Sequence, residues 1–133
     1  MATGFCTGIL EDLHDHLLTA SAMSQPAGRY CALWIGDPLG AGSEVTGSGY
    51  QRQAVTFGAA STAGEVVTSA NSAAIDFGTT GAAWGTVTHF AIYSAQTSGT
   101  MLATGLLDVS RAIASGDPVK FNIGECKLKS TRV

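Results

Sequence analysis

The pattern of apolar and polar positions changes its period once along this chain. Near the N-terminus, apolar residues recur at the three- and four-residue spacing of an amphipathic helix, at Ile9, Leu10, Leu13, Leu17 and Leu18. Acidic residues and histidines fill the other face. Thr7 is the expected N-cap, with acidic residues in the first turn. The helix is expected to end in the segment 19–28, which is rich in Ser and Ala and contains Pro26 and Gly28.

From Tyr30 onward the pattern is that of short strands separated by glycine-rich turns. A long polar loop is expected over Gly36–Gly49, and Ser115–Pro118 is a strong turn signal. Gly105 is expected to break a strand in its middle. The expected strands are Tyr30–Ile35, Tyr50–Phe57, Glu65–Thr68, Ala73–Phe77, Thr86–Tyr93, Met101–Leu107, Asp108–Ala114, Val119–Ile123 and Cys126–Lys129.

Many short strands with no helical pattern between them indicate an all-β fold, because parallel strands would need helical crossovers. We predict a single antiparallel β-sandwich, jelly-roll-like, with a short N-terminal α-helix. Residues 1–28 are expected to form a helix-and-linker extension, and residues 29–133 the β-sandwich domain. No internal repeat or second domain is expected.

The composition narrows the classes of partner. Hydrophobic residues make up 45% of the 133 residues and charged residues 13%, which excludes a disordered chain. The formal net charge of −3 gives no reason to expect nucleic acid or an anionic membrane as partner. No basic leader and no apolar run of roughly 20 residues occurs. We therefore expect folding in a reducing cytoplasm, with Cys6, Cys31 and Cys126 as reduced, buried thiols.

The search for chemistry is negative. The sequence contains no GxSxG, no phosphate-binding GxxxxGK[ST] and no EF-hand loop. His14 and His16 are two apart on the expected helix, so they point in different directions and do not chelate one ion. His89 is expected to be a hydrogen-bonded core or interface residue. We predict no catalytic, cofactor-binding or metal-binding residues, and no enzyme activity.

Surface contacts remain as the expected function of this chain. Ile9, Leu13 and Leu17 are the candidate interface residues on the helix. Arg52 is either an ordinary surface arginine or half of an intersubunit ion pair. Lys127 and Lys129 belong to a basic tail that either docks onto an acidic neighbour or frays.

Two stretches carry a resemblance to a known family. One reads Gly-Tyr-x-Arg-x-x-Val-x-Phe over residues 49–57, and the other reads Trp-Gly-x-Val-x-His-Phe over residues 84–90. Together with Tyr30–Pro38, Asn71–Phe77 and the turn Ser115–Pro118, they resemble small virion proteins of tailed bacteriophages, described as Gp80-like or tail fibre proteins. The resemblance extends over Leu10–Ile123. The C-terminal segment Glu125–Lys129 departs from it, being more charged than the usual strand there.

The resemblance implies a non-enzymatic structural protein of the virion, made in the host cytoplasm. Its partners would be the major capsid protein or tail proteins of the same phage, and it would form homo-oligomers on the particle. A compact, weakly charged domain with a helical arm and no heptads favours a capsid decoration, or cement, protein. A tail, baseplate or tail-fibre component is the alternative. A carbohydrate-binding module is the second alternative, which requires an exposed Trp34 or Trp84.

Overall fold

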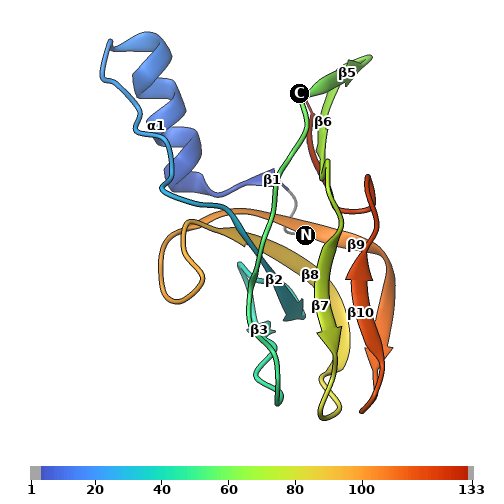
Figure 1. Ribbon diagram of the computed structural model, residues 1–133. Coiled ribbons are helices and arrows are strands. Elements are labelled where there is room, and N and C mark those ends of the chain that lie inside the picture. Colours follow the sequence, from blue (N-terminus) through green and yellow to red (C-terminus); the bar gives the residue numbers. More distant parts are fainter. Residues whose placement is uncertain (1–3, 132–133) are drawn as a thin grey trace.

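The computed structural model describes residues 4–131 and forms two packed layers of antiparallel strands with one helix beside them (Figure 1). The larger layer has the order β1-β9-β8-β2-β3, with β4 also paired to β2. Its strands are β1 (Gly4–Phe5), β2 (Tyr30–Ile35), β3 (Ser43–Glu44), β4 (Gln53–Ala54), β8 (Gly85–Tyr93) and β9 (Met101–Ile113). The helix is α1 (Thr7–Leu18). The predicted all-β class with a short N-terminal helix is confirmed.

The second layer is divided into two smaller sheets. A two-stranded sheet pairs β7 (Ile75–Thr79) with β10 (Pro118–Phe121). A three-stranded sheet has β6 (Val66–Ala70) between β5 (Ser61–Ala63) and β11 (Lys127–Thr131). The core lies between these sheets and the inner face of the large sheet. Its largest fully buried side chains include Phe90, Leu33, Ile75 and Val87.

The outer face of the large sheet has a small apolar cluster of its own. Ala32 and Ala91 are directly opposed on β2 and β8, and neither is exposed. Trp34, Tyr93 and Met101 pack against them. The middle strands are therefore buried on both faces, which explains why β8 has consecutive buried residues where its sequence alternates.

Gly105 does not interrupt β9, contrary to the expectation from sequence. The strand continues from Met101 to Ile113 because Gly105 leaves room for the Phe90 ring of the neighbouring strand. A Cβ atom at this position would lie 2.2 Å from Cζ of Phe90. The glycine is thus a packing requirement rather than a strand breaker.

The segment between β2 and β5 differs most from the prediction. Tyr50–Phe57 alternates as a strand does, but only Gln53–Ala54 pairs, apart from an isolated bridge between Phe57 and Asn71. The predicted loop 36–49 contains β3, which pairs with the other half of β2. Two short strands therefore share one edge of β2, and a side chain completes the interval between them, as described below.

The start of the helix also needs correction. The N-cap is Cys6 and Thr7 is the first helical residue, and no acidic residue lies in the first turn. Before the helix, Phe5 pairs with Ala103 of β9. The N-terminal extension expected over residues 1–28 therefore includes a strand of the main sheet.

Candidate functional site

The helix α1 is the most exposed apolar element of the described chain. None of its residues is buried. Leu17 and Leu18 are 68% and 76% exposed, and Leu10 and Leu13 are 43% and 39% exposed. Only Ile9, at the root of the helix, packs partly against the core. Of the three interface residues expected on the helix, Leu13 and Leu17 are exposed and Ile9 packs partly against the core.

Hydrogen bonds hold the two ends of α1 but no packing holds its middle. At the N-terminal end, the Cys6 N–H donates to the Leu102 carbonyl of β9 at 2.9 Å. At the C-terminal end, the Thr19 N–H and Oγ1 both donate to the Asp15 carbonyl, and the Met23 N–H donates to Nδ1 of His16. Helices of this length are marginal without tertiary packing. Within the described residues, α1 has little such packing beyond Ile9.

The polar side of α1 is acidic. Glu11, Asp12 and Asp15 lie within it, and residues 7–18 include no Lys or Arg. His14 and His16 are both exposed. Among residues 4–131, no three His, Cys, Asp or Glu side chains are grouped so that they could hold a metal ion.

A groove of about 480 Å³ opens between β9 and β10. Its floor is apolar and includes Leu33, Val87 and Phe121. One wall is the continuous segment 107–111 of β9. This segment bulges out of the sheet, since Leu106 pairs with His89 and Arg111 with Val87. Bulges of this kind recur at functional edges of sheets.

The rim of this groove is charged. The charged residues that line it are Asp108, Arg111, Lys120, Glu125 and Lys127. The only ion pair among the described residues involves none of them. Lys127, predicted as an interface residue, is thus placed at the groove. Lys129 is exposed on the same strand but does not line the groove.

A smaller cleft of about 260 Å³ lies at the root of α1. It is lined almost entirely by apolar side chains, among them Phe5, Ile9, Met23, Phe57 and Leu128. These come from β1, α1, the linker after α1, the isolated bridge at Phe57 and strand β11. The polar residues that line the cleft are Arg29 and Ser69.

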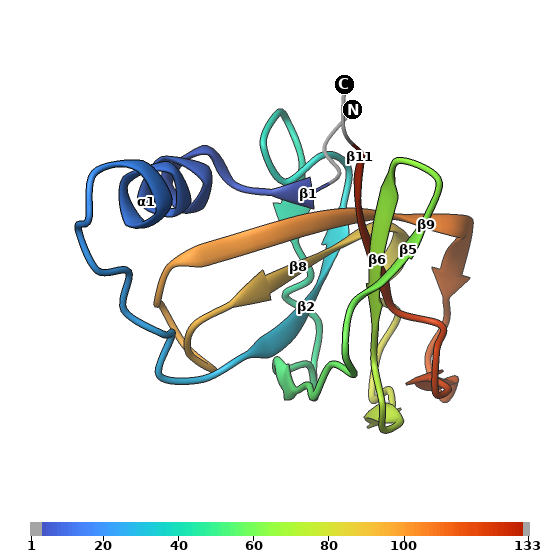
Figure 2. The ribbon, with the colours of Figure 1, turned by 90° about the horizontal axis from the view of Figure 1, so that it is seen from above.

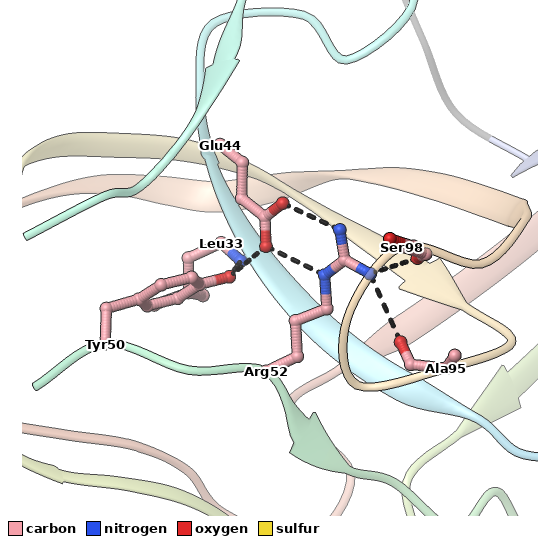
Figure 3. A network of polar contacts seen from close by, with 6 residues as sticks. All are labelled: Leu33, Glu44, Tyr50, Arg52, Ala95 and Ser98. Carbon is pink, nitrogen blue, oxygen red and sulfur yellow. Dashed lines mark hydrogen bonds and ion pairs between the residues drawn. The ribbon is translucent and has the colours of Figure 1, made fainter.

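Arg52 is bound within its own chain (Figure 3). Its Nε and Nη2 atoms each lie 2.9 Å from a carboxylate oxygen of Glu44, and its Nη1 donates to the carbonyls of Ala95 and Ser98. The guanidinium carbon lies 3.6 Å from the centre of the Tyr93 ring. Sequence reasoning left open a surface role or an intersubunit ion pair. The structure shows an intrachain clamp joining Glu44 of β3 to the turn after β8.

Tyr50 connects this clamp to the backbone of β2. Its hydroxyl donates to Oε2 of Glu44 at 2.7 Å and accepts the Leu33 N–H at 3.0 Å. The Leu33 carbonyl accepts the Val45 N–H. The tyrosine hydroxyl therefore replaces the strand partner that β2 lacks between β3 and β4, which satisfies a backbone donor at a sheet edge.

Electrostatics stabilise this network in its charged form. Burial acts to raise the pKa of Glu44, but hydrogen bonds from Arg52 and Tyr50 and the arginine charge outweigh it, so the pKa lies below the usual value. The hydrogen bond to Glu44 raises the pKa of Arg52. Burial, and then the bond to Glu44, raise the pKa of Tyr50 well beyond its usual range. All three shifts move the pKa further from neutral pH, so the charges of Glu44, Tyr50 and Arg52 do not change there.

The other residues singled out from the sequence are structural. His89 is 8% exposed, and its Nδ1 lies 2.8 Å from Oγ1 of Thr88, as expected for a hydrogen-bonded core histidine. Trp84 is buried, and its Nε1–H donates to the Ser48 carbonyl, so it is no platform for a sugar.

Cys31 and Cys126 are fully buried free thiols, whereas Cys6 is partly exposed. The expectation that all three thiols are buried was therefore wrong for Cys6.

Sequence reasoning missed the groove and the partners of Arg52. The groove is built from β9, β10 and the segment before β11, and no local pattern brings these together. Glu44 and Arg52 are eight residues apart with opposite charges, which was a weak local signal. Leu13 and Leu17, by contrast, were visible in the periodicity.

These features describe an all-β protein whose unpartnered surfaces are an acidic amphipathic helix and an apolar groove with a charged rim. No helix among the described residues is long and apolar enough to cross a membrane. The chain belongs to the Gp80 family of phage virion proteins, described as podophage GP4 fiber I protein gp80, whose sequence model matches residues 4–129. A search of curated proteins found no match.

Proposed function

We propose that this protein is a non-catalytic structural subunit of a phage fibre, and that α1 is the element through which it is built into the particle. The observation that carries the proposal is the exposed leucine face of α1. An exposed apolar face on a short helix is unfavourable in a lone chain and typical of one that a neighbour covers.

The family description supports a fibre rather than a capsid location. The cement hypothesis was drawn from the compact domain and its helical arm, and those features suit a fibre subunit equally. The carbohydrate-binding alternative requires an exposed tryptophan, and Trp84 does not meet this requirement because it is only 4% exposed.

Copy number in purified virions tests the location. We expect a small number of copies relative to the major capsid protein, measured by quantitative mass spectrometry of whole particles. A ratio that corresponds to a simple fraction of the capsid lattice would instead establish a cement role and overturn the fibre proposal.

Incorporation of variants tests the role of α1. Leu13→Asp with Leu17→Asp should remove the protein from particles while the β-sandwich stays folded, as followed by circular dichroism. Leu39 is 59% exposed in the turn after β2, so Leu39→Asp is a matched control that should be incorporated normally. Deleting the whole N-terminal segment is a poorer test, because it would also remove β1 from the sheet.

A further inference from the structure

The groove between β9 and β10 has three basic residues on its rim, whereas the exposed leucines of α1 are accompanied by acidic residues. In both ribbon views α1 and β10, which lines the groove, lie at opposite ends of the molecule (Figures 1 and 2). We propose that α1 of one copy docks into the β9–β10 groove of a second copy, so that copies join head to tail. This inference rests on the proposed attachment role of α1 and names its partner.

Charge complementarity favours this pairing. The helix carries Glu11, Asp12 and Asp15 with no basic residue over 7–18. The rim of the groove carries Arg111, Lys120 and Lys127, which are three of the 7 Lys and Arg residues of the chain, against Asp108 and Glu125. None of these three basic side chains forms an ion pair within the described residues. An acidic helix would provide partners for them, which also steers association.

The shapes are compatible with a helix-in-groove contact. Leu10, Leu13 and Leu17 lie at i, i+3 and i+7, so they project from one side of α1 as a row of anchors. The groove has a floor of core side chains, including Leu33, Val87 and Phe121, and a volume of about 480 Å³. Docking would cover both the exposed leucines and this apolar floor.

The placement of the two surfaces determines the kind of assembly. Because α1 lies at the opposite end of the molecule from β10, one copy cannot fill its own groove with its own helix. The contact joins two different surfaces, so each copy can donate one helix and accept another. Such heterologous contacts generate rings or open filaments rather than closed two-fold dimers. An open series of copies is one arrangement by which small subunits can build a fibre.

The test uses two variants of the full-length protein, each with one defective surface. The helix variant is Leu13→Asp with Leu17→Asp, and the groove variant is Lys120→Glu with Lys127→Glu. Light scattering coupled to size-exclusion chromatography gives the mass of each species, and circular dichroism confirms that each variant is folded. Leu39→Asp and Lys129→Glu are matched controls, since neither residue lies in either surface.

We expect the wild type to form species larger than a dimer as its concentration rises, and each variant alone to be monomeric. An equimolar mixture of the two variants should form a dimer and nothing larger, because only one competent helix and one competent groove remain. The two controls should associate as the wild type does. A wild type that stays monomeric, a helix variant that still associates, or a folded mixture that fails to dimerise would each overturn the proposal. Those results would leave the virion copy number to decide the fibre role separately.

Discussion

Arg52 and Glu44 form a two-point ion pair, with Nε and Nη2 of the arginine each 2.9 Å from a carboxylate oxygen. Their side chains are only 11% and 23% exposed. The same guanidinium binds two carbonyls of the turn after β8 and covers the ring of Tyr93. This single arginine therefore joins three segments that the short strands β3 and β4 hold weakly.

Replacing Arg52 by Ala should destabilise the fold by about 2–3 kcal/mol, because it leaves a partly buried carboxylate without its charge partner. Arg52→Lys should recover only part of this loss, since an ammonium cannot make the two-point contact. Urea unfolding, followed by tryptophan fluorescence, measures the free energy of unfolding of the two variants. Arg111 is exposed on β9, and Arg111→Ala should cost less than about 0.5 kcal/mol. Equal effects of Arg52→Ala and Arg111→Ala would contradict the clamp.

The stability that Glu44 contributes should depend on pH. Its pKa in the folded state lies below the usual value of 4.5, so its carboxylate stabilises the fold fully at pH values above 4.5. That contribution should disappear as the pH falls through the lowered pKa. The difference in unfolding free energy between wild type and Glu44→Gln should therefore be constant near neutral pH and shrink toward acid. Glu65, which is exposed in the β5–β6 turn and forms no ion pair among the described residues, is the control position for replacing a glutamate by glutamine. If the difference in unfolding free energy grew on acidification, the pKa of Glu44 would be raised in the folded state and not lowered.

Gly105 should not tolerate a side chain while Phe90 keeps its place. A Cβ atom would lie 2.2 Å from Cζ of Phe90, and the ring is 2% exposed with little room to move. Gly105→Ala should therefore destabilise by about 1–3 kcal/mol. Gly8 meets nothing within 4 Å, so Gly8→Ala is the matched control and should be neutral or slightly stabilising.

A double variant separates this clash from a general effect of alanine in a strand. In Phe90→Leu the ring that meets the new methyl group is gone, so adding Gly105→Ala to it should cost less than it does in the wild type. The two effects should thus be non-additive by about 0.5 kcal/mol or more. Thermal unfolding of the four proteins gives the coupling. Strict additivity would mean that the strand conformation of Gly105, and not the ring, requires glycine.

The sequence predicted those elements that have a long and regular pattern of apolar residues. The leucine spacing predicted α1, and the apolar run Tyr30–Ile35 and the alternation over Thr86–Tyr93 predicted β2 and β8. It failed at β3 and β5, which are two- and three-residue strands of mostly small or polar residues. Over Tyr50–Phe57 the sequence predicted a strand where the structure has only two paired residues, because the alternation there places side chains that bind Glu44. Tyr50 and Arg52 are there to bind Glu44 and the β2 edge, and most of the segment pairs with nothing.

Of the two candidate surfaces, the helix face could be predicted from the sequence and the groove could not. Leu13 and Leu17 could be predicted because the residues of one helix face recur at fixed, short spacing in the sequence. The groove could not, because Leu33, Val87 and Phe121 meet there only after three strands have been assembled. Lys127 was named for its charge, and its position on the groove rim depends on the pairing of β11 with β6.

The three cysteines should differ sharply in their reactivity. Cys31 and Cys126 are 0% exposed and lie in the core, and a hydrogen bond between their thiols, with burial, raises the pKa of Cys31 well above its usual value. Burial raises the pKa of Cys6 as well, but this residue is partly exposed beside α1. A maleimide reagent should therefore label native protein once, at Cys6, and label three sites only after unfolding. Cys6→Ser should abolish native labelling, whereas Cys31→Ser should leave it at one site. Native labelling of the Cys6→Ser variant at a rate that does not follow its unfolding would mean that the core opens locally around Cys31 and Cys126.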